Sequence, residues 1–265
     1  MNPKSLLDFY QIHPKKSLGQ NFVQDPHALE KIVAAAELSP DDTVLEIGPG
    51  TGALTEFLAQ IARRVIAVEL DMRLQPILSA ALGHLRHVEF VYADILKTDV
   101  PALVGVGDYV VVANVPYYIT SAILRSLLDS PHRPRRIVMT VQLEVAERLV
   151  AKPGDMNLLA VSAQFYAKTR NVARLKAGTF WPRPDVDSAI VRLDTYPQPI
   201  VAVPDEQTFF RIVKAGFSQK RKQLKNALGD EGSALLAQAG IDPKRRAETL
   251  TLDEWAALAR ASKGM

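Results

Sequence analysis

Apolar residues follow two spacings along this chain, and their alternation predicts the order of strands and helices. Short apolar runs indicate strands that are buried on both faces, whereas apolar residues three to four positions apart are typical of amphipathic helices. The strand-like runs lie at 43–47, 64–68, 88–92, 108–113 and 137–141. The helical patterns between and before them lie at 26–36, 54–61, 72–82, 121–128 and 143–150.

This alternation predicts an α/β fold in which helices cover both faces of a parallel sheet. Two late strands, at 172–175 and 189–193, are expected to form an antiparallel edge. The proline-punctuated segment 196–204 predicts a linker, and only helical patterns follow it. We therefore expect two domains: an arm plus α/β domain over 1–200, and a small all-helical domain over 205–265.

Composition narrows the class of protein. Of the 265 residues, 48% are hydrophobic and 23% are charged, with no long uncharged apolar run and no signal-like N-terminus, so we expect a cytoplasmic protein without membrane contact. The chain has no cysteine, which excludes disulfides and cysteine nucleophiles. Its five histidines lack ligand spacing, and we expect no metal.

Residues suited to binding a ligand follow the predicted strands. Their position is significant because ligands bind at the carboxyl ends of parallel strands. The first strand ends in the glycine loop 48–52, where Gly48 and Gly50 allow a ligand to approach the backbone closely. Glu69 ends the second strand, where a carboxylate can accept both ribose hydroxyls of an adenosine. Asp94 is suited to an adenine amino group, and Ile95 to the ring. The alternatives are an ordinary turn, a solvated acid at Glu69 and a helix cap at Asp94.

The glycine spacing distinguishes between two nucleotide cofactors. It is G-x-G-x-G rather than the G-x-G-x-x-G of dinucleotide-binding folds. We expect Glu46 at the mouth of the loop, and no Lys or Arg occurs from 45 to 62. An acid there repels a pyrophosphate but suits an ammonium and a sulfonium, which favours S-adenosylmethionine over NAD.

The segment Asn114-Val115-Pro116-Tyr117 after the fourth predicted strand is the most specific signal. An exocyclic adenine amine is a poor nucleophile, because its lone pair is delocalised into the ring. Two acceptors, the Asn114 side-chain oxygen and the Pro116 carbonyl, can draw the nitrogen toward tetrahedral geometry and release that lone pair. Tyr117 offers a face on which the base can stack. The alternative is a strand-end turn with a buried tyrosine.

Six basic residues and no acids occur from 211 to 225, in a protein whose net charge is +3. We expect a helix over about 220–228 on which Leu224 and Leu228 face a core. Arg221, Lys222 and Lys225 would then reach solvent and contact RNA phosphates. A merely solvated helix face is the alternative.

Five segments together resemble the bacterial KsgA family of S-adenosylmethionine-dependent dimethyltransferases of small-subunit ribosomal RNA. They are Lys15-Lys-Ser-Leu-Gly-Gln-Asn-Phe22, Glu46-Ile-Gly-Pro-Gly-Thr-Gly52, Asn114-Val-Pro-Tyr117, Phe180-Trp-Pro-Arg-Pro-Asp-Val-Asp-Ser-Ala189 and Phe217-Ser-Gln-Lys-Arg-Lys-Gln-Leu-Lys-Asn-Ala-Leu228. The erythromycin-resistance methyltransferases, which act on large-subunit RNA, share the catalytic half, whereas the last segment resembles the ribosome-assembly branch.

The resemblance implies a Rossmann-like methyltransferase domain with a small helical C-terminal domain. It also implies dimethylation of the N6 amines of two adjacent adenosines in the 3′-terminal hairpin loop of 16S ribosomal RNA, in the assembling 30S subunit. A monomer is expected. Phe180 would form a second aromatic wall opposite Tyr117. Cofactor contacts are carried over to Asn21, Val23, Gly48, Glu69, Asp94 and Asn114.

This chain departs from the family pattern at a few positions. Val23 and Val115 stand where leucine is common, and Ala93 replaces a glycine, all with little chemical consequence. The segment 154–161 lacks the usual tyrosine and arginine, which puts an RNA role of that segment in doubt. Two other functions stay open: a methyltransferase for free nucleobases or protein amines, and a non-catalytic RNA-binding assembly factor.

Overall fold

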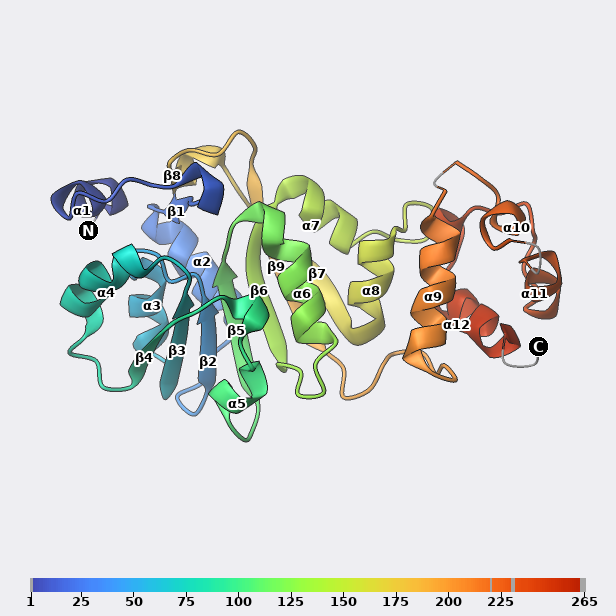
Figure 1. Cartoon of the computed structure of the whole chain (residues 1–265), viewed down its shortest axis with the longest axis horizontal. Helices are drawn as coiled ribbons and strands as arrows, with labels where there is room; N and C mark the ends of the chain where they lie inside the picture. Colours follow the sequence, from blue (N-terminus) through green and yellow to red (C-terminus); the bar gives the residue numbers. More distant parts are fainter. Residues whose placement is uncertain (1, 220, 230–231, 263–265) are drawn as a thin grey trace. The chain divides into compact units, whose positions relative to one another are not determined.

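The predicted strands assemble into one seven-stranded sheet with the order β4–β3–β2–β5–β6–β9–β7 (Figure 1). The structure is a computed structural model, and it describes residues 2–219, 221–229 and 232–262. The first five strands along the sheet run parallel, and β9 pairs antiparallel with β6, as expected. The bounds are β2 (Thr43–Ile47), β3 (Arg64–Glu69), β4 (Val88–Tyr92), β5 (Tyr109–Asn114), β6 (Arg136–Gln142), β7 (Ala167–Leu175) and β9 (Ser188–Thr195).

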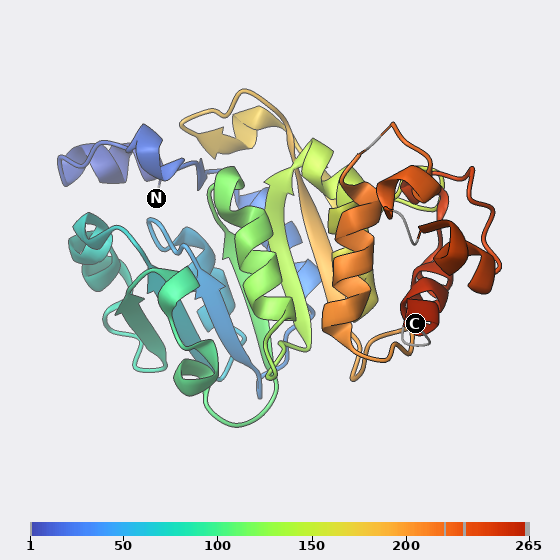
Figure 2. The ribbon, with the colours of Figure 1, turned by 45° about the vertical axis from the view of Figure 1, so that its right-hand side comes forward.

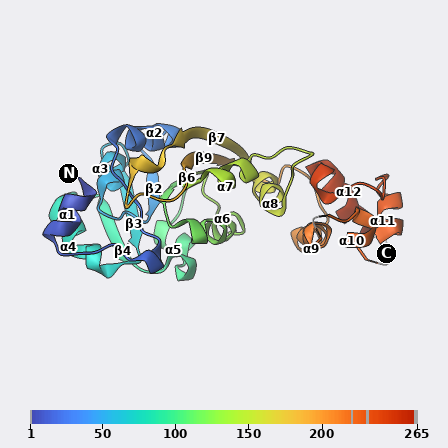
Figure 3. The same ribbon diagram turned by 90° about the horizontal axis from the view of Figure 1, so that it is seen from above.

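Helices cover both faces of this sheet (Figure 3). On one face, α2 (Pro26–Ala36) and α3 (Ala53–Ala59) bury apolar side chains against β2, β5 and β6. The Asp25 side chain accepts a hydrogen bond from the His27 backbone N–H and so caps α2, as its position before Pro26 predicts. The other face carries α5 (Val100–Val104) and α6 (Thr120–Leu128).

The N-terminal arm runs above the carboxyl ends of the parallel strands, as Figure 2 shows in dark blue. Its helix α1 (Pro3–Phe9) shares a small apolar cluster with α4 (Gln75–Leu82). The arm continues through η1 (Lys16–Leu18) into β1 (Phe22–Val23), which pairs antiparallel with β8 (Phe180–Trp181). Short turns of 3-10 helix close several loops: η2 (Met72–Leu74), η3 (Ile95–Lys97), η4 (Tyr117–Ile119) and η5 (Ala177–Thr179).

The chain forms two compact units. One spans Met1–Ala146 and Thr169–Thr195, and the other spans Glu147–Lys168 and Tyr196–Met265. Helix α7 (Leu143–Leu149) crosses the boundary. The second unit contains α8 (Leu158–Tyr166), α9 (Glu206–Phe217), α10 (Leu224–Ala227), α11 (Gly232–Gln238), η6 (Ala247–Thr249) and α12 (Leu252–Ala261). Stacked rings of Phe165 and Phe209 contribute to its core, and Thr251 with Glu254 forms a capping box that starts α12.

The prediction of a helix over about 220–228 is wrong. Lys220 lies outside the described residues, Arg221 and Lys222 lie in a turn and a bend, and α10 covers only Leu224–Ala227. The backbone N–H of Leu224 donates to the carbonyl of Arg245, and that of Lys225 donates to Pro243. Hydrogen bonds to a distant loop therefore replace those that a continuous helix would make.

The segment 154–161, which departs from the family pattern, has a structural position in the second unit. The backbone N–H groups of Gly154 and Met156 both donate to the Glu248 carbonyl, and the Asn157 side chain caps α8. Within the described ranges, no helix has the length and apolar character that a membrane span requires.

Candidate active site

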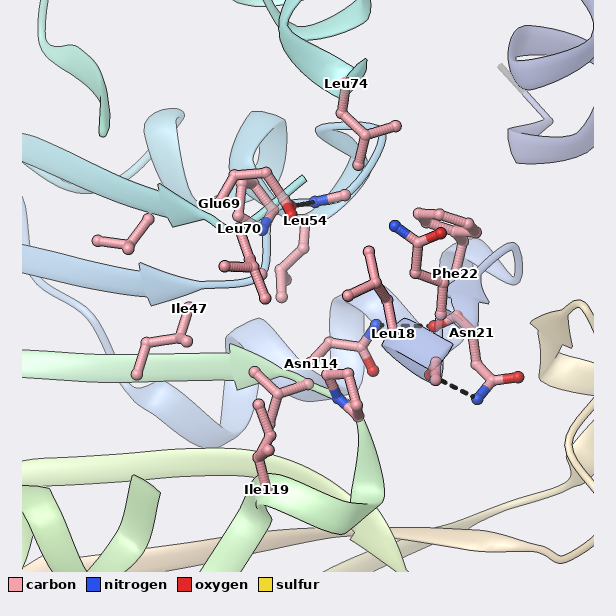
Figure 4. Close-up of a pocket in the computed structure, with 18 of the residues that line it drawn as sticks. Leu18, Asn21, Phe22, Ile47, Leu54, Glu69, Leu70, Leu74, Asn114 and Ile119 are labelled. Atoms are coloured by element: carbon pink, nitrogen blue, oxygen red, sulfur yellow. Dashed lines mark hydrogen bonds between the residues drawn. The ribbon is translucent and has the colours of Figure 1, made fainter. Parts of the chain in front are cut away.

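A cavity opens at the carboxyl ends of β2, β3 and β5, and the N-terminal arm forms one of its walls (Figure 4). Every residue expected to contact the cofactor lines it, although the sequence separates the first from the last by more than ninety positions. These residues are Asn21, Val23, Gly48, Gly50, Glu69, Asp94, Ile95 and Asn114. Pro116 and Tyr117 line the same cavity. The strand-end pattern, with the family resemblance for Asn21 and Val23, therefore pointed to residues that line one cavity.

The glycine loop leaves no room for side chains at the cavity. Gly48 and Gly50 have φ values of +76° and +60°, a region that L-residues rarely adopt. A Cβ at Gly48 would lie 3.0 Å from the Asn114 carbonyl oxygen, and one at Gly50 would lie 2.9 Å from the Phe22 ring. The backbone of the loop is consequently the surface that a ligand meets.

Glu69 is fixed at the end of β3 by the backbone on both sides of its carboxylate. One oxygen accepts the Gly50 N–H at 3.1 Å, and the other accepts the Asp71 N–H at 2.8 Å. Burial raises the pKa of Glu69, and these two hydrogen bonds oppose the rise. A carboxylate oxygen has more than one acceptor direction, so each retains capacity for a hydroxyl of a ligand.

Glu46 does not stand at the mouth of the loop, which corrects the expectation from sequence. Its side chain is fully buried within β2 and does not line the cavity. Burial raises the pKa of Glu46 to about 8; the Thr55 hydroxyl opposes this rise, and the charge of Glu69 adds to it. A carboxyl that is mostly neutral at pH 7 cannot repel a pyrophosphate, so Glu46 does not discriminate between the two cofactors as argued.

Asn114 ends β5, and both ends of its side-chain amide are engaged. The Nδ2 group donates to the Asn21 carbonyl at 3.1 Å, a bond visible in Figure 4. The Oδ1 atom accepts from the Thr140 hydroxyl at 2.5 Å. Nearby, the Tyr117 hydroxyl forms a hydrogen bond of 2.6 Å with Ser188, which fixes the position of its ring. Hydrogen bonds from β6 and β9 thus hold Asn114, the predicted acceptor, and Tyr117, the predicted stacking residue.

Asp94 combines the two interpretations that its sequence position allows. One oxygen accepts the Leu96 backbone N–H and caps η3, as the alternative interpretation expects. Its side chain is nevertheless about one-third exposed at 34% and lines the cavity together with Ile95. A capping carboxylate retains acceptor capacity, so the cap is compatible with a ligand contact.

A clasp of three side chains, Gln20, Asp71 and Arg73, fastens the arm beside the cavity. Gln20 donates to the Asp71 carboxylate at 2.9 Å, and Arg73 makes a salt bridge with the same group at 2.6 Å. Arg73 also donates to the backbone carbonyl of His13. Although burial opposes it, these hydrogen bonds lower the pKa of Asp71. The arm is therefore tied to the segment that follows Glu69.

Phe180 does not line the cavity. It is 1% exposed, pairs with Val23 between β8 and β1, and belongs to the core cluster under α2. The residues expected to bind RNA belong to the other unit: Arg221, Lys222 and Lys225 are all exposed there. The structure thus brings together the cofactor and acceptor residues of the first unit, without Phe180.

Sequence reasoning missed the groups that support these residues. Gln20, Asp71, Thr140 and Ser188 were not identified, because each acts on a partner far away in the sequence. Gln20 lay within a segment that carries the family resemblance, which was a usable signal. Thr140 lies within an apolar strand, and only the pairing of β5 with β6 places it beside Asn114.

S-adenosylmethionine fits the residues at this cavity. A buried, backbone-oriented carboxylate at the second strand end suits two ribose hydroxyls, and the glycine backbone leaves space beside it. Ile95, Leu70 and Val115 supply apolar walls for a ring. The strand order and the site together define a Rossmann-like methyltransferase.

Comparison with known proteins identifies the family. The family model described as ribosomal RNA adenine dimethylase matches residues 12–263. The chain belongs to this family, whose members use S-adenosylmethionine as methyl donor. It is 42% identical to the ribosomal RNA small subunit methyltransferase A of Geobacillus sp. (strain WCH70), covering 97% of this chain and 94% of the relative. The enzyme of that name from Moorella thermoacetica is 45% identical, covering 93% and 92%.

Solved structures agree on the fold. A dimethyladenosine transferase from Plasmodium falciparum superposes with a TM-score of 0.76 at 24% identity, covering 89% of this chain and 95% of that chain. The 23S rRNA methyltransferase ErmE superposes with a TM-score of 0.72 at 30% identity, covering 91% and 99%. The chain is therefore an S-adenosylmethionine-dependent ribosomal RNA adenine dimethyltransferase by family, and the expected fold class is confirmed.

Proposed function

We propose that this chain dimethylates the N6 amines of two adjacent adenosines in the 3′-terminal hairpin loop of 16S ribosomal RNA. The supporting observation is that Asn114, Pro116 and Tyr117 line the same cavity as Glu69 and the glycine loop. The small-subunit names of the relatives that are 42–45% identical favour this RNA over the large-subunit RNA on which ErmE acts.

Asn114 and Pro116 prepare the amine for reaction. Their two oxygens accept the two N–H bonds of the adenine N6 group and draw its geometry toward tetrahedral, which frees the lone pair. Tyr117 stacks against the base, and its bond to Ser188 keeps the ring in one orientation. These interactions strengthen as the nitrogen changes geometry, so they act on the transition state more than on binding.

Glu69, Asp94 and the glycine loop hold the methyl donor. Glu69 accepts from the ribose hydroxyls, Asp94 accepts from the adenine amine, and Ile95 packs on the ring. When bound, S-adenosylmethionine supplies a methyl group activated by its sulfonium. The arm residues Asn21 and Val23 close the cavity beside it, and the clasp keeps them there.

The exposed residues Arg221, Lys222 and Lys225 contact phosphates of the ribosomal RNA. The proposed site of action is the assembling 30S subunit in the cytoplasm, with the enzyme acting as a monomer. Phosphate contacts supply most of the affinity of such an interface and depend strongly on salt. A turn, a bend and the short helix α10 replace the expected continuous helix, and the same three charges remain exposed.

Methyl transfer to isolated ribosomal particles tests the proposal. Small and large subunits lacking the modification are incubated with labelled S-adenosylmethionine, and nucleosides are separated after digestion. We expect label in N6,N6-dimethyladenosine from small subunits only. Label in large-subunit RNA would support the erythromycin-resistance type of activity, and no label in any RNA would support a non-catalytic assembly factor.

A further inference from the structure

We infer that Thr140 is a positioning residue, whose hydroxyl holds the Asn114 amide oxygen in the position needed to accept the target amine. The inference deepens the proposed function and rests on it. Thr140 lies directly beside Asn114 in the parallel pairing of β6 with β5. Its side chain is fully buried and does not line the cavity, so it acts through Asn114 rather than on a substrate.

An asparagine amide has two chemically different ends, and only its oxygen can accept a hydrogen bond from the adenine amine. In the reversed orientation, the Nδ2 group would face the amine, and two donors would oppose each other. A site that relies on this oxygen therefore requires groups that exclude the reversed orientation.

One neighbour of Asn114 excludes it, and a second holds the amide in the orientation that remains. The Asn21 carbonyl can only accept, so it requires the Nδ2 group at its side, where the two atoms are 3.1 Å apart. The Thr140 hydroxyl donates to Oδ1 at 2.5 Å. A hydroxyl can also accept, so Thr140 does not select the orientation; it restrains the position of the oxygen once the Asn21 carbonyl has set that orientation. Loss of Thr140 would leave Oδ1 without a donor from the sheet.

The bond from Thr140 does not consume the acceptor. A carbonyl-type oxygen has two lone pairs, and Thr140 occupies one of them. The other remains for the N6–H of the base. The expected role is thus to hold the amide oxygen in one position before RNA binds, which lowers the reorganisation that the reaction requires.

The test replaces Thr140 with valine, which keeps the branched shape of the side chain and removes the donor. We expect the single-turnover methyl-transfer rate on small subunits to fall about three- to tenfold, the effect of one hydrogen bond. The dissociation constants for S-adenosylmethionine and for the subunit should change less than twofold. Thr140→Ser should keep the rate of the unaltered chain. The control Thr43→Val, at the amino end of β2, should leave the rate unchanged.

A double-mutant cycle separates positioning from a general structural effect. In an Asn114→Ala background no amide remains to be oriented, so Thr140→Val should cause no further loss. An equal loss in both backgrounds would overturn the inference, as would an unchanged rate for Thr140→Val in the otherwise unaltered chain. If the unaltered chain itself transfers no methyl group to small-subunit adenines, the proposed function fails instead. The two failures are therefore distinguishable.

Discussion

The cavity at the strand ends and the basic segment 221–225 of the helical unit differ in how their polar groups are held. Glu69 is 6% exposed, and both of its oxygens accept backbone hydrogen bonds. Arg221, Lys222 and Lys225 are exposed, and no ion pair within the described part of the chain involves them. A buried, oriented group suits recognition of one small ligand, whereas exposed cations suit a repeating array of phosphates. The difference indicates that chemistry and RNA affinity can be altered separately.

The largest effect should come from Asn114→Ala. Loss of a preorganised group that acts in the transition state costs about 10²–10³ in rate. We therefore expect the single-turnover rate to fall by that factor while subunit affinity changes less than twofold. The control is Asn171→Ala, an exposed position on β7. A rate equal to that of the unaltered chain would contradict the role of Asn114.

Glu69→Ala should weaken cofactor binding. Hydrogen bonds to a charged group contribute about 1.5–3 kcal/mol, so the dissociation constant for S-adenosylmethionine should rise roughly 10- to 150-fold in calorimetry. Subunit affinity measured without cofactor should not change. Glu56→Ala, on the exposed face of α3, is the matched control. Equal affinity of the Glu69 variant would remove this residue from the ribose site.

Charge reversal at Arg221, Lys222 and Lys225 should weaken binding to the small subunit and leave cofactor binding unchanged. We expect subunit affinity to fall by roughly tenfold at physiological salt, and the slope of log affinity against log salt to decrease by about two units. Cofactor affinity should stay the same. Reversal of Lys31, Arg63 and Arg86, which are exposed on the first unit, gives the same change in net charge and should cost less. An unchanged slope would reassign RNA contact to other basic residues.

Glu46→Gln should produce a smaller effect, and one that depends on pH. The pKa of Glu46 is raised from 4.5 to about 8 in the folded chain, mainly by burial. Between these values the unfolded chain is ionised at this residue and the folded chain is protonated, so rising pH destabilises the fold. The melting temperature of the glutamine variant should thus increase relative to the unaltered chain between pH 5 and pH 8.

The residues of the candidate site could be picked out from the sequence because they follow strands whose apolar runs are unambiguous. Glu69, Asp94 and Asn114 were found in this way, and the sheet does bring them to one cavity. The prediction that the Glu46 side chain lies at the mouth of the loop was wrong. A position next to a loop in the sequence does not show on which side of the strand the side chain lies. Thr140 was missed because its contact with Asn114 depends on strand pairing across 26 positions.

The helical unit was harder to predict in detail. Its helical character was predicted correctly, because helical periodicity depends on local spacing. The helix expected over 220–228 failed because local leucine spacing competes there with bonds from Leu224 and Lys225 to the carbonyls of Arg245 and Pro243. Tertiary hydrogen bonds of this kind leave no periodic trace in a sequence.

Mass spectrometry of nuclease fragments of small-subunit ribosomal RNA, which retain the positions of modified nucleotides, tests the proposed activity most directly. RNA is compared from cells that lack this chain, cells that carry it, and cells that carry Asn114→Ala at equal abundance. We expect N6,N6-dimethyladenosine at two adjacent positions near the 3′ end only when the unaltered chain is present. The same modification in cells lacking the chain, or its full restoration by Asn114→Ala, would contradict it.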